Sequence, residues 1–207
     1  CDRHFGVGAD GLILVLPSQK ANYKMRIFNP DGSEAEMCGN GIRCFTRYVY
    51  EESEEKKDVI SVETLAGIIV PAVILENGVV SSVEVDMGIP KVESLKESIN
   101  IEGQTFKINK ISMGNPHCVI FVDDVSKIDV LSLGPIIENL PQFPNRTNVE
   151  FASVINRKEI KVDVWERGAG RTLACGTGAC AVAVAAASNN LADRNVVIHL
   201  PGGDLEI

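Results

Sequence analysis

The chain has 207 residues, of which 45% are hydrophobic and 23% are charged, and its formal net charge at pH 7 is −8. This composition is typical of a globular protein that can bury one large core or two small ones. An acidic chain without a cluster of lysine and arginine is not expected to bind nucleic acid, and no apolar run approaches the roughly 20 residues that cross a bilayer. We therefore expect a small-molecule partner, no nucleic acid, no membrane and a cytoplasmic location.

Both ends of the sequence indicate the interior of a longer protein. The first residue is Cys1 and strand-like sequence follows almost at once, while the last residues, "GGDLEI", read as extended chain. The six cysteines are better explained as reduced thiols than as disulfides, because a chain of this size does not need bridges to replace a core.

Short segments rich in Val and Ile dominate the sequence, and many of them alternate as half-buried strands do. The expected strands cover residues 11–16, 23–28, 59–64, 67–75, 79–87, 118–124, 148–155, 159–166 and 195–200. Turn residues separate several of these runs, at 29–32, 76–78 and 201–203. Because the connections are short, we expect the strands to be largely antiparallel.

Three helices are expected, over roughly residues 40–53, 129–140 and 177–190. The last contains "ACAVAVAAASN", whose alanine content is typical of a helix that is buried nearly all round. The first and third each follow a Cys-Gly-x-Gly stretch, "CGNG" from residue 38 and "CGTG" from residue 175.

The two Cys-Gly-x-Gly stretches indicate a duplicated unit. Cys38 and Cys175 lie 137 residues apart, about one domain length, and the order of strands, turn, cysteine and helix is similar around each. Gly88 and Pro90 interrupt the strand pattern between them. We expect one half over residues 1–86, with an N-terminal segment missing, and another over 87–207, with the C-terminal end truncated.

A cysteine at a helix N-terminus has chemical consequences. The unpaired amides and the helix dipole there can lower the pKa of the thiol, and the same amides can hold a substrate anion such as a carboxylate. If the two halves face each other, Cys38 and Cys175 would offer one thiolate and one thiol to the same carbon. Moving a proton off one face and onto the other inverts a stereocentre.

Other interpretations of the cysteines stay open. A buried cysteine is most often a small inert hydrophobe, which is how we interpret Cys44, Cys118 and Cys180. A zinc- or redox-responsive module built on the cysteine pairs is an alternative, although Cys38 and Cys44 are more widely spaced than most zinc ligand pairs.

Taken together, five stretches resemble the diaminopimelate epimerase family. They are "RHFGVGADGL" (3–12), "RIFNPDGSEAEMCGNGIRC" (26–44), "MGNPHCV" (113–119), "RTNVEF" (146–151) and "ERGAGRTLACGTGACA" (166–181). The resemblance implies an α+β fold of two pseudo-symmetric domains, each a mostly antiparallel or mixed β-sheet wrapped around a central α-helix. It implies interconversion of LL- and meso-diaminopimelate in lysine and peptidoglycan precursor synthesis, with no pyridoxal phosphate and no metal, and it leaves a homodimer open.

The resemblance also implies roles for individual residues. Cys38 and Cys175 would be the two acid/base residues, with His117 and Glu166 as polar partners that set the protonation of the thiols. Taken alone, His117 is more typical of a structural histidine, and Glu166 with Arg167 of a solvated ion pair.

Further residues would bind the substrate. The carboxylate and ammonium at the distal end of the substrate would be bound by Asn29, Asn115, Asn148, Glu166 and Arg167. Its reacting carboxylate would be held by the backbone amides of Gly39, Asn40, Gly176 and Thr177. Some family members carry glutamine where Gly11 stands, so a side-chain contact there is absent.

A racemase of the same fold that acts on proline or hydroxyproline is the nearest rival. Those enzymes typically carry histidine where Asn40 stands, and they need no pocket for a second amino-acid head group. The set of Asn, Glu and Arg residues therefore favours diaminopimelate.

Overall fold

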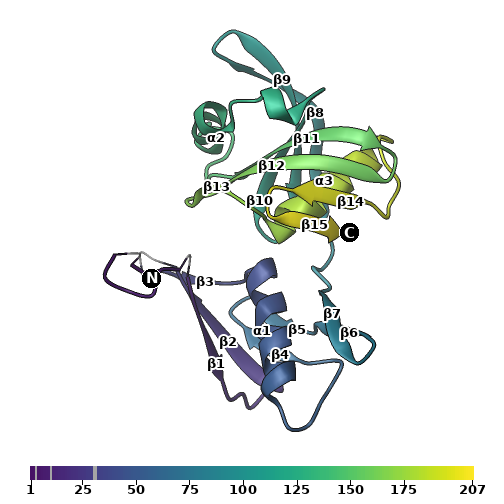
Figure 1. Ribbon diagram of the computed structural model, residues 1–207. Helices are drawn as coiled ribbons and strands as arrows, with labels where there is room; N and C mark the ends of the chain where they lie inside the picture. The colour runs from purple at the N-terminus through teal and green to yellow at the C-terminus, as the bar shows by residue number, and fades with distance from the viewer. Residues whose placement is uncertain (3, 10, 30–31) are drawn as a thin grey trace. The chain divides into compact units, whose positions relative to one another are not determined.

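The structure is a computed structural model that describes residues 1–2, 4–9, 11–29 and 32–207 (Figure 1). The chain forms two compact units, Cys1–Asp86 and Met87–Ile207. In the described part of the chain, no helix is long and apolar enough to span a membrane.

The first unit pairs a five-stranded sheet and a separate hairpin with one helix (Figure 1). The sheet has the order β1-β2-β4-β5 with β3 on β2, and its strands are β1 (Leu12–Leu16), β2 (Tyr23–Phe28), β3 (Glu34–Ala35), β4 (Val62–Thr64) and β5 (Gly67–Ile69). The hairpin consists of β6 (Ala72–Glu76) and β7 (Val79–Glu84). The helix α1 (Gly39–Glu52) packs on β1, β2, β6 and β7.

One face of α1 forms the core of this unit. Ile42, Phe45 and Val49 recur at helical spacing and are at most 4% exposed, and they pack with Met25 and Val62 from the sheet. The opposite face of the helix is polar and exposed.

The second unit is built on an eight-stranded sheet with the order β15-β14-β12-β11-β10-β9-β8 and with β13 on β12. Its strands are β8 (Lys91–Ile101), β9 (Gln104–Ser112), β10 (Pro116–Phe121), β11 (Asn148–Asn156), β12 (Glu159–Glu166), β13 (Gly170–Thr172), β14 (Val197–Leu200) and β15 (Gly203–Glu206). Its helices are the 3-10 turn η1 (Val125–Lys127), α2 (Val130–Glu138) and α3 (Gly176–Ser188).

Two separate cores lie in this unit, and the alternation of β-strands divides residues between them. Along β11, Val149 and Phe151 belong to the core that contains Ile137 of α2, whereas Ala152 belongs to the core that contains most of α3. The intervening Glu150 therefore lies on the α3 side. The alanines of α3 fit because this helix is buried on nearly every side, with a 0% exposed Ala185 among its residues.

The two units contain the same topological repeat. In the first, β2 pairs antiparallel with β1 and β3 and parallel with β4, and β4 pairs antiparallel with β5. In the second, β12 makes the same pairings with β11, β13 and β14, and β14 pairs with β15. In both repeats a helix, α1 or α3, joins the two parallel strands.

The register of the repeats matches residue for residue before each cysteine. Ile27 pairs with Ala35 in the first repeat, and Val164 pairs with Thr172 in the second. Ile27 and Val164 lie 137 residues apart, as do Ala35 and Thr172, and this is also the separation of Cys38 and Cys175. The same spacing relates Arg26 to Asp163 and Glu34 to Arg171.

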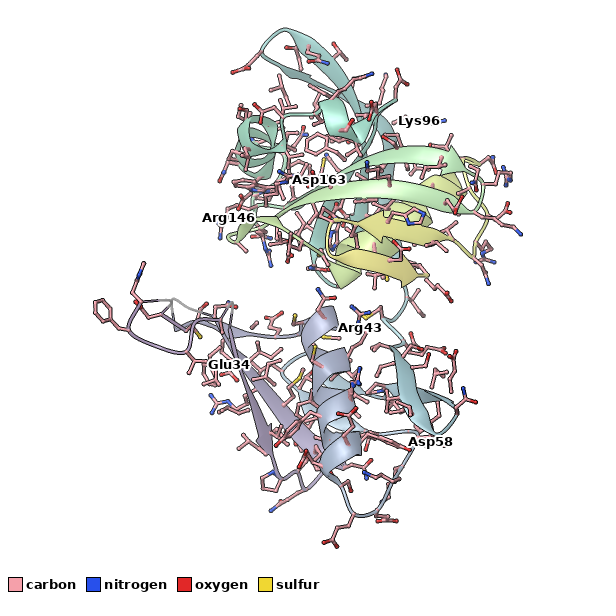
Figure 2. All side chains as sticks on the ribbon, viewed as in Figure 1. Glu34, Arg43, Asp58, Lys96, Arg146 and Asp163 are labelled. Carbon is pink, nitrogen blue, oxygen red and sulfur yellow. The ribbon has the colours of Figure 1, made fainter. Side chains whose placement is uncertain are left out.

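A two-pronged ion pair between equivalent positions joins the strands in each repeat, but with the charges exchanged. Arg26 Nε lies 2.8 Å from Glu34 Oε1, and Arg171 Nη2 lies 2.6 Å from Asp163 Oδ2. Figure 2 labels Glu34 and Asp163, one in each unit. A bidentate arginine–carboxylate pair fixes geometry as well as charge, so it holds together the strands that lead to each cysteine.

The observed elements confirm the expected α+β class, the three helices and the largely antiparallel pairing. The run expected over 67–75 is split, because Pro71, which has no amide hydrogen, interrupts it between β5 and β6. The long hairpin of β8 and β9 was not predicted, since its outer residues are charged and exposed. Two residues of the turn expected at 29–32 lie outside the described part of the chain.

We predict that Ala185→Leu destabilises the protein by about 1–3 kcal/mol, because added methylene groups have no space beside a fully buried position of α3. Ser188→Leu makes the same helix larger at an exposed position and serves as the control. Thermal unfolding followed by circular dichroism measures both variants. Equal effects of the two substitutions would contradict the tight packing of α3.

Candidate active site

Each cysteine of the repeated motif caps the helix that follows it. Cys38 precedes α1 with φ −140° and ψ 114°, and its sulfur accepts a hydrogen bond from the amide of Gly41 at 3.3 Å. Cys175 precedes α3 with φ −129° and ψ 113°, and it accepts from the amide of Gly178 at 3.3 Å. The two sulfurs hold the same place at a helix N-terminus, where amides and the helix dipole stabilise a thiolate.

The last glycine of each Cys-Gly-x-Gly motif lies close against the cysteine. A Cβ on Gly41 would lie 3.2 Å from Cβ and 3.3 Å from Sγ of Cys38. A Cβ on Gly178 would lie 3.2 Å from both of these atoms of Cys175, and 2.8 Å from Oε1 of Glu150. A side chain at either position would crowd the cysteine, and at Gly178 it would also collide with the buried carboxyl group of Glu150.

Burial dominates the protonation of Cys175. Its side chain is 7% exposed, and burial raises the pKa of the thiol well above its ordinary value. The charges of Glu166 and Glu150 raise this pKa further, whereas hydrogen bonds from the Thr177 hydroxyl and the Gly178 amide lower it. Cys175 is therefore a thiol at neutral pH and needs a base to become a thiolate.

Glu166, at the end of β12, is the carboxyl group beside that thiol. It accepts a hydrogen bond from the Thr172 hydroxyl at 2.5 Å and a further one from Cys175. Burial raises the pKa of Glu166, and it outweighs the lowering effect of these hydrogen bonds. A carboxylate with a raised pKa is a better base, so Glu166 suits removal of the Cys175 proton.

His117 and Glu150 form a buried pair on neighbouring parallel strands. His117 lies opposite Asn148 in the β10/β11 ladder, and its Nδ1 lies 2.6 Å from Oε1 of Glu150, with both side chains 0% exposed. The other ring nitrogen, Nε2, lies 3.0 Å from Oδ1 of Asn115. The Asn115 amide in turn donates to the Thr177 hydroxyl at 3.2 Å, so these contacts join β10 to the first turn of α3.

Asn148 links two loops beside the candidate site. Its amide donates to the carbonyl of Pro116 at 2.9 Å, and its oxygen accepts from the backbone amide of Arg167 at 3.0 Å. The exposed side chain of Arg167 donates to the carbonyl of Asn145. The side chain of Asn148 therefore positions the backbone of Arg167.

A second buried carboxylate, Glu138, holds the loop that follows β12. It accepts from Nε1 of Trp165 at 2.7 Å, from the amide of Gly168 at 3.0 Å and from Arg146 at 3.1 Å. These bonds flank Glu166 and fix where its strand ends.

In the first unit, the predicted site residues lie at the start of α1 and the end of β2. Gly39 and Asn40 form the first turn of α1, and Oδ1 of Asn40 accepts from Arg43 at 2.6 Å. Asn29 is exposed and donates to the hydroxyl of Ser33 at 3.0 Å. In the second unit Gly176 has the place that Gly39 has in the first.

A sequence profile described as "Diaminopimelate epimerase" matches residues 1–93 and 110–207. The chain belongs to the diaminopimelate epimerase family. It is 57% identical over 219 residues to the diaminopimelate epimerase of Moorella thermoacetica and 54% identical over 219 residues to that of Pelotomaculum thermopropionicum. Each alignment covers all of this chain and 78% of the relative.

Solved structures of low sequence identity share the fold. A hydroxyproline epimerase from Agrobacterium vitis is 18% identical with a TM-score of 0.74, over 95% of this chain and 65% of that one. A phenazine biosynthesis protein of the PhzF family from Bacillus anthracis is 17% identical with a TM-score of 0.76, over 97% of this chain and 76% of that one. At such identities the likeness concerns the fold alone.

The predicted residues of the second unit of this epimerase-family chain gather around the start of α3. Cys175, Gly176 and Thr177 begin the helix, and Glu166 adjoins the sulfur. The remaining ones are joined to this group or to its loops by the bonds given above, namely His117, Asn115, Asn148 and Arg167.

Two buried carboxylates of the site, Glu150 and Glu138, were missed by the sequence analysis. Glu150 had a signal, because a glutamate interrupts the apolar strand "NVEFASVI" at a position that points toward a core. One interpretation of a cysteine was wrong. Cys118 and Cys180 are buried as expected, but Cys44 is exposed, since helical spacing turns it away from the face of Ile42 and Phe45.

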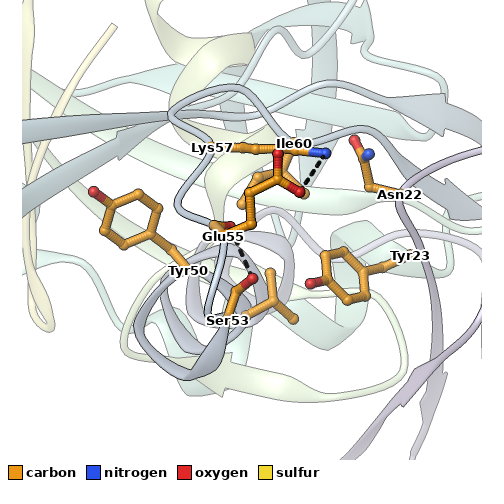
Figure 3. A pocket seen from close by; sticks show the side chains of 8 residues that line it. Asn22, Tyr23, Tyr50, Ser53, Glu55, Lys57 and Ile60 are labelled. Atoms are coloured by element: carbon orange, nitrogen blue, oxygen red, sulfur yellow. Dashed lines mark hydrogen bonds and ion pairs between the residues drawn. The ribbon is translucent and has the colours of Figure 1, made fainter.

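The pocket in Figure 3 belongs to the first unit, and none of the site residues named above is among the residues that line it. It has a volume of about 170 Å³ and is formed around the C-terminal end of α1 by side chains such as Tyr23, Tyr50 and Lys57. Cys38 lies at the opposite end of the same helix, so we assign no part of the reaction to this pocket.

No disulfide joins any of the six cysteines, all of which the structure describes. Within residues 1–2, 4–9, 11–29 and 32–207, no group of three or more His, Cys, Asp or Glu side chains could hold a metal ion.

Because the pKa of Glu166 is raised in the folded state, folding favours its protonated form. The resulting stability is present below the ordinary pKa of 4.5 and is lost as the pH rises through the raised value. Glu166→Gln keeps an acceptor for Thr172 and cannot ionise, so we predict that it becomes increasingly more stable than the wild type between pH 4 and pH 8. Melting temperatures across this range measure the difference, with the exposed Glu206→Gln as control. A difference that does not depend on pH would contradict the assignment.

Proposed function

We propose that this chain epimerises LL-2,6-diaminopimelate to meso-diaminopimelate, as a step of lysine and peptidoglycan precursor synthesis. The observation that carries the proposal is the pair of cysteines at equivalent helix N-termini of two repeats, in a chain that belongs to the diaminopimelate epimerase family. The relatives that are 57% and 54% identical carry the name of this activity, which supports the same substrate here.

The reaction transfers one proton off the α-carbon and another onto its opposite face. A thiolate at Cys38 takes the α-proton, and the thiol of Cys175 delivers its own proton to the other face, so that one stereocentre is inverted and no redox change occurs. The reverse direction exchanges the roles, and Glu166 then takes the Cys175 proton before the substrate reacts. This chemistry needs no cofactor.

Charge builds up on the substrate carboxylate while the α-carbon lacks its proton. The amides of the first helical turns, at Gly39 and Asn40 in one repeat and Gly176 and Thr177 in the other, would stabilise it. Neither α1 nor α3 carries an acidic residue in its first turn, so no carboxylate of these turns repels a substrate anion there.

The distal amino-acid group of the substrate requires donors for its carboxylate and acceptors for its ammonium. We assign this task to Asn29, Asn115, Asn148, Glu166 and Arg167. The side-chain bonds of Asn148 support an indirect part for it, as the residue that orients Arg167.

We further propose that the two compact units, residues 1–86 and 87–207, are the two halves of the epimerase, and that the chain works in the cytoplasm. The mechanism supports this location because it needs two reduced thiols, which a reducing compartment maintains. A homodimer is also part of the proposal, which gel filtration with light scattering tests.

Incubation with LL-diaminopimelate in heavy water tests the proposed reaction. We expect deuterium at the α-carbon and the meso isomer as product, with a loss of about 10²- to 10⁴-fold in kcat for Cys38→Ala and for Cys175→Ala. Cys44→Ala changes an exposed cysteine on the same helix as Cys38 and should retain full activity. Near-normal turnover of either active-site variant would exclude the two-cysteine mechanism.

The same assay separates the alternatives. A proline or hydroxyproline racemase would exchange the α-proton of those amino acids instead of that of diaminopimelate. A zinc or redox module would lose its function in a chelator or require an oxidised state. We expect activity that persists in a chelator and is lost reversibly on oxidation, with a Cys38–Cys175 disulfide as the oxidised product detected by mass spectrometry.

A further inference from the structure

Glu150 is a buried charged residue to which the reaction above assigns no role. It is 0% exposed on β11, and although its Oε1 contacts His117, its Oε2 has no hydrogen-bond partner among the described residues. Such an oxygen is costly to bury. The carboxyl group also packs directly against the start of α3, since a Cβ on Gly178 would lie 2.8 Å from Oε1.

The contacts of His117 determine which ring nitrogens carry hydrogen. Nε2 faces the oxygen of Asn115, an acceptor, so Nε2 carries a hydrogen. Nδ1 faces Oε1 of Glu150 at 2.6 Å, and a single proton lies between them.

The orientation of Asn115 also determines how the hydrogen bonds run from Asn115 to the sulfur of Cys175. With its oxygen toward His117, the Asn115 amide presents its NH₂ group to the Thr177 oxygen at 3.2 Å. A hydroxyl group has one hydrogen, and that of Thr177 is then left to point at Sγ of Cys175, 3.5 Å away. We call this series the Glu150 chain, and its members in order are Glu150, His117, Asn115, Thr177 and Cys175.

We propose that Glu150 is a positioning residue, which fixes the direction of the Glu150 chain and so keeps a hydroxyl hydrogen on the sulfur of Cys175. The inference rests on the proposed function, because it affects turnover only if Cys175 exchanges a proton. Without Glu150, the direction of the series is no longer fixed, and the arrangement with the His117 hydrogen on Nδ1 and the Asn115 amide turned over becomes accessible. The Thr177 hydrogen then bonds to Asn115, and a thiolate at Cys175 loses one of its donors.

Removal of Glu150 should change the thiolate population of Cys175 in opposite directions, depending on whether Glu150 acts by positioning or by charge repulsion. Among the described residues, the charged groups that act on Cys175 are Glu166 from β12 and Glu150 from β11, and Glu150 is paired with His117 from β10. If Glu150 acted only as a negative charge, its removal would favour the thiolate. If Glu150 acts through the Glu150 chain of hydrogen bonds, its removal disfavours the thiolate of Cys175.

Alkylation of Cys175 by iodoacetamide at pH 8, followed by peptide mass spectrometry, tests the proposal in a double-mutant cycle. We expect Glu150→Leu and Thr177→Val each to slow alkylation about three- to tenfold, because a lost hydrogen bond to a thiolate reduces its population. Because both act on the same bond, the double variant should be no slower than Thr177→Val. Faster alkylation of Glu150→Leu, or losses that multiply in the double variant, would overturn the proposal.

Three further variants serve as controls or as a replacement in the double-mutant cycle. Thr177→Ser restores a hydroxyl and should restore the alkylation rate lost in Thr177→Val. Asn109→Leu removes another buried polar group from the same sheet, and its effect should multiply with that of Thr177→Val. If Glu150→Leu does not fold, Asn115→Ala replaces it in the double-mutant cycle. This variant interrupts the Glu150 chain at a half-buried residue.

The alkylation readout needs no substrate, so it separates the two proposals. An active wild type in which the cycle shows independent losses overturns the role of Glu150 and leaves the epimerase function standing. A wild type that exchanges no α-proton of diaminopimelate overturns the function alone. In an active enzyme, Glu150→Leu should lower kcat while KM changes less than about twofold, because no part of substrate binding is assigned to Glu150.

Discussion

The site depends on a hydrogen bond from a backbone amide to a cysteine sulfur at the start of a helix. The place of the usual Ser, Thr, Asp or Asn cap is taken by Cys38 in α1 and by Cys175 in α3. The bond orients the sulfur at the N-terminus of its helix. The geometry that begins each helix is therefore the same geometry that a proton-transferring thiol and a substrate carboxylate require.

Two opposing effects act on Cys175, and their balance explains the residues around it. The helix N-terminus favours the thiolate, but burial of a 7% exposed sulfur favours the thiol and prevails. A thiol held in this way can deliver a proton but cannot remove one without help. Our proposal assigns that help to Glu166, whose own pKa the same burial raises. Burial thus raises the pKa of the Cys175 thiol and that of the neighbouring Glu166 carboxyl group together.

The sequence alone predicted the elements whose signals are local. The motif glycines, the alanines of α3 and the alternating strands each reflect a constraint within a few residues. The hairpin of β8 and β9 was missed because its stability comes from pairing between strands, while its side chains are largely polar. Glu138 and Glu150 were missed for a related reason, since only the tertiary structure shows what a buried carboxylate contacts. The outward position of Cys44 follows from helical periodicity and was available in the sequence.

The two copies of the repeat share a backbone but differ in the side chains beside the cysteine. The register before each cysteine is identical, yet Asn29 stands where the second repeat has Glu166, and Ala35 stands where it has Thr172. The second repeat therefore has a carboxyl group and its hydroxyl partner beside the sulfur, and these side chains have no equivalent at the same positions of the first. A reaction that takes a proton on one side and gives one on the other needs two thiols in similar positions but in different protonation states. Repetition of the backbone provides the first condition, and the side chains that surround Cys175 differ from those at the equivalent positions of the first repeat.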